Sequence, residues 1–202
     1  MPLWISPQPL VLASRSDIRA KMLAAAGLRF ESRPAQIDER AVEAESGVTD
    51  AAAVARLLAR AKAAAVASTL PGRLVLGADQ TLARGARRFT KPAGRADAVE
   101  QLRALRGRTH DLHSAIALVR DDKVLFDCVD SARLTMRNIS DRFLEDYLDM
   151  VGAAALASVG AYQLEGIGVH LFEQVEGDFF TILGLPLLPL LTYLRQNKLI
   201  DG

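Results

Sequence analysis

The first residues that could do chemistry form a polar cluster between an apolar run and the start of a predicted helix. The cluster reads Ser14-Arg15-Ser16-Asp17, and Arg19 follows one turn later. A helix N-terminus offers free backbone N–H groups and a partial positive charge, both of which attract anions. Two hydroxyl groups and two guanidinium groups at such a place suit a phosphate. The alternative is an ordinary polar loop in which Asp17 caps the helix.

A carboxylate, Asp79, ends a second apolar run, residues 74–78 (LVLGA), and Gln80 follows it. An acid at the end of a core strand lies where α/β sheets open toward a ligand. Such an acid can hold Mg²⁺ through its oxygens or accept a proton from water. The alternative is that Asp79 only caps a turn.

Other titratable residues are less specific by themselves. Lys62 lies late in a predicted helix and Lys91 follows a predicted hairpin, so either could be an ordinary surface lysine. We predict that His110 and His113 are solvated strand residues and not a metal pair, because no further His or Cys is nearby. The remaining acids in predicted loops are Glu39, Glu165, Glu176 and Asp178.

The elements that must position these residues form a mixed pattern of helices and buried strands. Predicted helices cover residues 18–26, about 50–68, 95–105, 141–150 and 186–196. Predicted strands cover residues 10–13, 28–32, 74–78, 81–83, 88–90, 109–120, 123–137, 169–173 and 179–183. This mixture predicts an α/β or α+β fold with one mixed sheet.

Composition narrows the class of protein. The chain has 202 residues, half of them hydrophobic, which predicts one folded domain with room for two lobes. A formal charge of +1 provides no global field toward nucleic acid or an anionic membrane. The single Cys128 excludes an intramolecular disulfide and a cysteine-clustered zinc site.

The chain shows no pattern typical of a secreted or membrane protein. Its first ten residues lack a basic segment followed by an apolar core, so we expect no secretory signal. The most apolar stretch, residues 182–194, is too short to span a bilayer and contains Pro186 and Pro189. We therefore expect a cytoplasmic protein.

Taken in order, these pieces resemble the Maf (septum formation inhibitor-like) family of nucleoside triphosphate pyrophosphatases. The matching segments are LVLASRSDIRAKMLAAAGLRFE (10–31), IDE (37–39), LLARAKA (57–63), VLGADQT (75–81), TKP (90–92), LRALRGRTHDLHSAIAL (102–118) and GAYQLEGIGVHLFEQVEGDFFTILGLPL (160–187). The resemblance implies an elongated mixed sheet flanked by helices, like that of inosine triphosphate pyrophosphatases. Residues 1–202 would form a single domain with two lobes, a nucleotide cleft between them, and usually a homodimer.

The resemblance also implies a reaction and a set of site residues. A nucleoside triphosphate would be hydrolysed to the monophosphate and diphosphate with Mg²⁺ or Mn²⁺. Ser14, Arg19, Lys62 and Lys91 match triphosphate-binding positions, Glu39 matches an acid of the site, and Asp79 matches the proton acceptor. The assignment is catalytic for Asp79, Lys91 and Lys62, substrate-binding for Ser14, Arg15, Ser16, Arg19, Gln80 and Glu165, and metal-binding for Glu39 and Asp79.

Base preference is the finest expectation. Gln80 and Glu165 match the branch that acts on 7-methyl-GTP, whereas the branch that acts on dTTP and UTP has Thr and Gln there. Guanine presents two adjacent donors that one carboxylate can accept. Ile18 departs from both branches, which have an aromatic residue or Arg there. The alternatives are a pyrimidine nucleotide pyrophosphatase and a non-catalytic nucleotide sensor that inhibits division; intact Asp79, Lys62 and Lys91 favour catalysis.

Overall fold

Parallel and antiparallel pairing are combined in one sheet. The structure is a computed structural model that describes residues 3–201. Within that range seven strands form a sheet of order β2-β1-β3-β5-β6-β7, with β4 paired to β3. The strands are β1 (Leu10–Leu12), β2 (Phe30–Ser32), β3 (Val75–Arg84), β4 (Arg87–Phe89), β5 (Thr109–Arg120), β6 (Lys123–Met136) and β7 (Phe172–Glu176). β1 runs parallel to β2 and β3, whereas β4 and β7 pair antiparallel. The prediction of a mixed α/β fold is confirmed.

Helices cover this sheet, and the chain divides into two compact units. The helices are α1 (Asp17–Ala25), α2 (Glu39–Ser46), α3 (Ala51–Ala67), α4 (Arg95–Leu105), α5 (Asp141–Val151), α6 (Phe179–Ile182) and α7 (Leu187–Gln196), with short 3₁₀ turns η1 (Gly152–Ala157), η2 (Val159–Ala161) and η3 (Ile167–Leu171). Of the described residues, unit 1 comprises 3–80, 113–130 and 179–201, and unit 2 comprises 81–112 and 131–178. None of the helices described is long and apolar enough to cross a bilayer.

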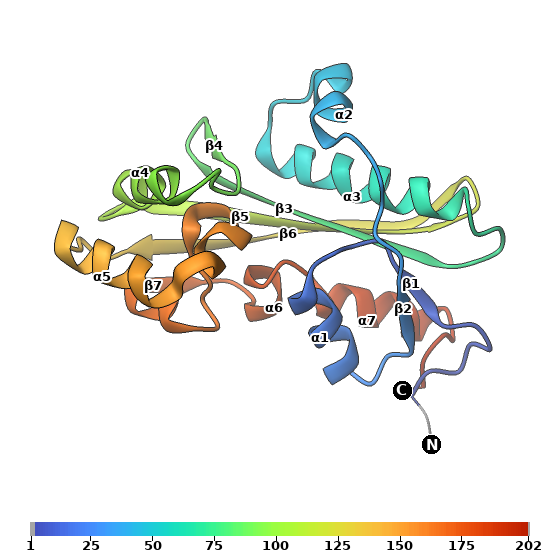
Figure 1. Cartoon of the computed structure of the whole chain (residues 1–202). Coiled ribbons are helices and arrows are strands. Elements are labelled where there is room, and N and C mark those ends of the chain that lie inside the picture. Colours follow the sequence, from blue (N-terminus) through green and yellow to red (C-terminus); the bar gives the residue numbers. More distant parts are fainter. Residues whose placement is uncertain (1–2, 202) are drawn as a thin grey trace. The chain divides into compact units, whose positions relative to one another are not determined.

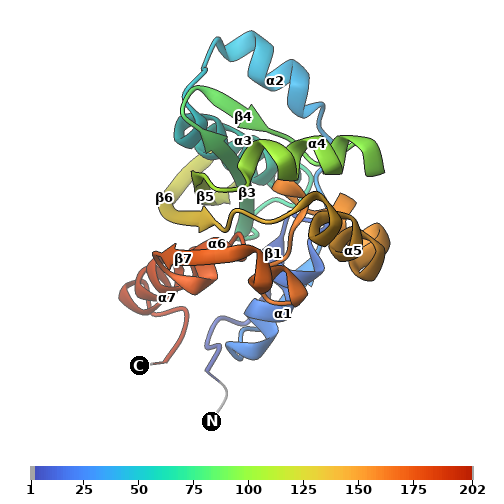
Figure 2. The same ribbon diagram turned by 90° about the vertical axis from the view of Figure 1, so that its left-hand side faces the viewer.

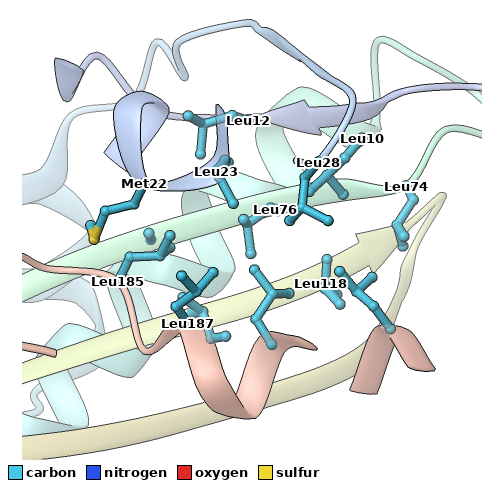
Figure 3. Packing of buried hydrophobic residues seen from close by; sticks show 14 of the residues in the cluster. Leu10, Leu12, Met22, Leu23, Leu28, Leu74, Leu76, Leu118, Leu185 and Leu187 are labelled. Atoms are coloured by element: carbon cyan, nitrogen blue, oxygen red, sulfur yellow. The ribbon is translucent and has the colours of Figure 1, made fainter. Parts of the chain in front are cut away.

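Helices lie on both faces of the unit 1 strands, α3 on one face and α1 and α7 on the other (Figure 1), and each face carries part of the core. On one face, leucines of α1 and α7 pack against the alternate strand residues Leu12 and Leu76. Figure 3 shows part of this cluster, in which Leu23 of α1 and Leu187 of α7 are labelled. The alternation of side chains along a strand sends the intervening residues to the opposite face, which α3 covers.

Small residues bring α3 unusually close to β3. Ala55, Ala59 and Ala63 recur every four residues and form one buried face of α3. A Cβ added to Gly77 would lie only 2.1 Å from the carbonyl oxygen of Ala59, so the helix rests on a strand that has no side chain there. This close contact brings the later part of α3, with Lys62, next to Asp79, which lies two positions after Gly77 on the same face of the strand.

Unit 2 has its own core, in which α4 and α5 lie side by side (Figure 2). An aromatic cluster closes this core around His110, whose Nε2 lies 2.7 Å from the Tyr162 hydroxyl. The His110 ring also lies near Phe172. The side chain is 1% exposed, so the prediction that His110 is a solvated strand residue was wrong. Alternation along β5 places it on the inward face, where the packing of Tyr162 and Phe172 excludes water.

Burial lowers the pKa of His110 to about 4, which gives a pH-dependent stability. The ordinary histidine pKa is about 6.5, so folding favours the neutral ring. The resulting stabilisation is complete above pH 6.5 and is lost as the pH falls toward 4, where the folded protein would also protonate. We expect a loss of about 2–3 kcal/mol between pH 7 and pH 4, measured by urea unfolding. The variant His110→Gln should lose less over this range than the control His170→Gln; equal losses would contradict the prediction.

Several predicted elements need correction. Helix α2 was missed, because it is only eight residues long, buries no side chain and has only Ala41, Val42 and Ala44 as apolar residues. Residues 179–183, predicted as a strand, form the short helix α6. Residues 169–173 are mostly the turn η3, and the strand begins at Phe172. The N-cap of α1 is Ser16, with Asp17 in the first turn. The hairpin predicted before Lys91 is confirmed, because β3 and β4 pair around Gly85. Residues 121–122 join β5 to β6, and Asp50 and Ser140 are the N-caps of α3 and α5.

Candidate active site

Two carboxylates meet at one ammonium group in unit 1. Lys62 Nζ donates to Asp79 Oδ1 at 2.5 Å and lies 2.8 Å from Glu39 Oε1. Asp79 comes from β3, Lys62 from α3 and Glu39 from the first residue of α2, whose N-cap is Asp38. Asp79 is 7% exposed, whereas Glu39 is open to solvent. Because Glu39 is the first residue of α2, its predicted placement in a loop was wrong.

A guanidinium group lies next to this trio. Arg19 projects from α1, and its Nη1 donates to the Ala78 carbonyl at 2.8 Å and to Ser14 Oγ at 3.2 Å. Its Nε donates to the Gly184 carbonyl at 2.7 Å. Three acceptors on separate segments fix the guanidinium plane, so Arg19 is held in one orientation before any ligand arrives.

Burial and charge act in opposite directions on Asp79. Removal from water raises the pKa of the Asp79 carboxyl, while Lys62 and Arg19 lower it and Glu39 adds a smaller raising effect. The net direction is upward, which favours a group that must accept a proton. Burial also lowers the pKa of the Arg19 guanidinium, against the attraction of Asp79 and Glu39. A guanidinium stays charged in proteins, so Arg19 remains a cation.

Gln80, which follows Asp79, uses its amide nitrogen inside the protein. Its Nε2 donates to Ser114 Oγ at 3.0 Å and to the carbonyls of Ile182 and Thr181 at 2.9 and 3.3 Å. Ser114 Oγ in turn donates to the Thr181 carbonyl at 2.7 Å. Because the amide nitrogen of Gln80 is used in these bonds, a contact between Gln80 and substrate would involve the amide oxygen, Oε1.

The remaining predicted residues fall into two sets. Ser16 Oγ caps α1 by accepting from the Arg19 backbone N–H, and Arg15 is exposed. Lys91 follows β4 and Glu165 lies in the turn before η3; both are exposed and both belong to unit 2. The structure thus brings together Ser14, Arg19, Glu39, Lys62 and Asp79 within unit 1, and the roles of Lys91 and Glu165 stay predictions.

The carboxylates of Glu39 and Asp79 suit a divalent cation whose remaining ligands come from the substrate. Glu39 and Asp79 both reach the position of Lys62 Nζ, so their oxygens approach a common point. Among residues 3–201, no group of three or more His, Cys, Asp or Glu side chains is placed to hold a metal ion. Mg²⁺ is commonly held by one or two carboxylates plus phosphate oxygens and water, which two acids can satisfy.

Sequence reasoning missed three residues that support the site. Ser114 and Thr181 are fully buried and polar, and Gly184 accepts from Arg19. Ser114 is a polar residue inside a buried apolar strand, which is a usable signal because buried hydroxyls need partners. Thr181 gave no such signal, because residues 179–183 were predicted to be a strand. Gly184 gave none either, because it directly follows that predicted strand.

Comparisons with known proteins identify the family to which this chain belongs. Residues 9–197 match the family model described as Maf-like protein, so the chain belongs to that family. It is 58% identical over 201 residues to a nucleoside triphosphate pyrophosphatase of Nitrobacter winogradskyi, covering 100% of both chains. It is 55% identical over 195 residues to a 7-methyl-GTP pyrophosphatase of Rhizobium etli, covering 96% of this chain and 98% of the relative.

The predicted family and enzyme class, a hydrolase of acid anhydrides, are thus confirmed at the level of the family. The crystal structure of a nucleoside-triphosphatase, or dITP/XTP pyrophosphatase, of Mycobacterium abscessus is more distantly similar. Its TM-score is 0.41 at 16% identity, over 95% of this chain and 96% of that chain. The fold class therefore rests on the strands and helices described above.

Proposed function

We propose that this protein hydrolyses a nucleoside triphosphate to the monophosphate and diphosphate. The observation that carries the proposal is the buried Asp79 carboxylate with two cations, Lys62 and Arg19, fixed beside it. A triphosphate carries about four negative charges, and the bond that breaks leaves more charge on the departing diphosphate. Fixed cations stabilise such charge without reorganising, which is the main contribution proteins make to phosphoryl chemistry.

Each residue has a distinct part in this proposal. Asp79 orients a water molecule and takes its proton as the water oxygen attacks the α-phosphorus. The bond from that phosphorus to the oxygen bridging to the β-phosphorus breaks, and diphosphate leaves. Lys62 and Arg19 bind phosphate oxygens, and Ser14 Oγ accepts from the Arg19 guanidinium while its own O–H group can still donate. Lys91 is proposed as a further catalytic cation.

A divalent cation, Mg²⁺ or Mn²⁺, is proposed to bind Glu39 and Asp79 together with substrate oxygens. When bound, it neutralises phosphate charge. The two carboxylates support this proposal because their oxygens already converge on one cationic group, Lys62.

Glu165 is proposed to select a guanine base, 7-methylguanine above all. A carboxylate accepts from the N1–H and the 2-amino group of guanine, whereas uracil and thymine offer one donor beside acceptors. The variant Glu165→Gln should therefore reduce the ratio of kcat/KM for 7-methyl-GTP over UTP by about 10-fold or more, with the fold unchanged. The control is Glu173→Gln, an exposed acid of unit 2. An unchanged ratio in Glu165→Gln would refute the role.

The proposal is tested with purified protein, Mg²⁺ or Mn²⁺, and a panel of 7-methyl-GTP, GTP, UTP, dTTP, CTP, ATP and inosine triphosphate. Diphosphate and monophosphate are measured together. Equal amounts of both, with 7-methyl-GTP fastest, support the full proposal. Fastest release from UTP or dTTP keeps the reaction and discards the guanine preference. Tight nucleotide binding without release favours the nucleotide sensor.

Three further expectations remain proposals. A homodimer, implied by the family resemblance, is tested by sedimentation at several concentrations. A single domain with two lobes predicts that both lobes unfold together, which is tested by following the unfolding of each lobe in the same experiment. A cytoplasmic location is tested by fractionating cells that make the tagged protein.

A further inference from the structure

Residues 181–184, the end of α6 and the two residues after it (called the turn below), make direct contact with two residues of the site. The Gly184 carbonyl accepts from Arg19 Nε, and the carbonyls of Thr181 and Ile182 accept from Gln80 Nε2. Arg19 lies on α1 and Gln80 on β3, so this short segment of unit 1 contacts side chains from two separate elements. The contacts use backbone carbonyls, whose position depends on the conformation of the turn and not on its side chains.

That conformation is one that only glycine adopts easily at residue 184. Its φ is +93°, in the region that L side chains rarely enter. A Cβ at this position would lie 3.3 Å from Arg19 Nη2, 3.4 Å from Arg19 Nε and 3.6 Å from Gln80 Oε1. The missing side chain therefore leaves room for the Arg19 guanidinium, whereas a Cβ would make only an ordinary van der Waals contact with the Gln80 amide oxygen.

The turn is itself held in place by buried side chains. Thr181 Oγ1 donates to Asp130 Oδ2 at 2.6 Å, and Ser114 Oγ donates to the Thr181 carbonyl at 2.7 Å. Both Ser114 and Thr181 are fully buried. Buried hydrogen bonds to a charged group are short and strong, so the turn has little freedom to follow a displaced partner.

We propose that Gly184 is a positioning residue of the active site, which fixes Arg19 through its carbonyl and leaves space for the Arg19 guanidinium through its lack of a side chain. The consequence for activity rests on the proposed function of Arg19 as a phosphate-binding group. A displacement of the guanidinium by a few tenths of an ångström would weaken interactions that depend on close geometry.

The test compares Gly184→Ala with Gly72→Ala. Gly72 also belongs to unit 1 and has a φ of +75°, but a Cβ there would meet nothing within 4 Å. Both variants carry the strain of a left-handed alanine, and only the first presses on the site. We expect kcat/KM for the best nucleotide to fall at least 10-fold in Gly184→Ala and less than 2-fold in Gly72→Ala.

A double-mutant cycle separates positioning from general destabilisation. If Gly184 acts through Arg19, Gly184→Ala should cost less than 2-fold in a protein that already carries Arg19→Ala. A full and independent loss in that background would overturn the proposal, as would equal losses in the two glycine variants. Should Gly184→Ala not fold, Gly184→Asn and Gly72→Asn replace the pair, since Asn enters positive φ more readily.

A readout without nucleotide keeps this proposal apart from the proposed function. The Nε–H of Arg19 gives its own NMR signal, and its bond to the Gly184 carbonyl should slow its exchange with water. We expect at least 10-fold faster exchange in Gly184→Ala and no change in Gly72→Ala. This result can be obtained even if the protein hydrolyses no nucleotide, and unchanged exchange in Gly184→Ala would contradict the positioning role.

Discussion

Replacing Asp79 with Asn should lower kcat by about 10²–10⁴-fold while the protein stays folded. The amide has nearly the same size as the carboxylate, but it cannot accept a proton from water. It also removes one of the two negative partners of Lys62, whose Nζ lies 2.5 Å from Asp79 Oδ1. The measurement is diphosphate release under saturating nucleotide, with circular dichroism to show that the fold is retained.

The pH profile gives this prediction a second, independent part. Burial raises the pKa of Asp79, so the acidic limb of kcat/KM should lie above the ordinary aspartate pKa of about 3.9. That limb should be absent from the residual activity of Asp79→Asn. The matched control is Asp127→Asn, because Asp127 is a similarly buried aspartate of unit 1 that pairs with Arg60 and Arg56 outside the site. Near-normal turnover in Asp79→Asn would remove Asp79 from the mechanism.

Much of the fold follows from local chemistry that can be read along the chain. The helix Arg95–Leu105 has the predicted bounds because its apolar residues recur at helical spacing. The caps Asp50 and Ser140 each accept from the backbone three residues ahead, as short polar side chains do at helix starts. Such features depend on neighbours within a few residues, so the sequence alone contains the information.

Two of the wrong predictions concern features that depend on distant neighbours. His110 has the same polar character as His113, and only the packing of Tyr162 and Phe172, more than fifty residues away, decides that it is buried. Residues 179–183 are β-prone in composition, yet they form a helical turn. In this conformation Thr181 donates to Asp130 and the Gly184 carbonyl accepts from Arg19. Long-range packing overrode local preference at both places.

The candidate site shows the same division. The residue types at positions 14, 19, 62 and 79 indicate anion binding and proton transfer separately, and the resemblance to a family grouped them. No pattern in the sequence predicts that Lys62 forms ion pairs with both Asp79 and Glu39. That arrangement depends on the alanine face of α3 resting against Gly77, which brings Lys62 to the end of the buried strand.

Replacing Lys62 with Met should be the second most damaging change, with kcat/KM falling about 10²–10³-fold. Methionine keeps the length of the side chain and removes its charge. Asp79 and Glu39 would then face each other without the ammonium group between them. Since Lys62 lowers the pKa of Asp79, its removal should move the acidic limb of the pH profile to higher pH.

Two controls show whether this effect comes from the charge at that place. Lys62→Arg retains the positive charge and should recover part of the activity and return the acidic limb toward its original pH. Lys21→Met removes an exposed lysine of α1 in the same unit and should change neither quantity. If Lys62→Met lost activity with the acidic limb unmoved, Lys62 would bind phosphate without changing the pKa of Asp79. If activity stayed near normal, the ion pair between Lys62 and Asp79 would stabilise the fold alone, and Asp79 would act without Lys62.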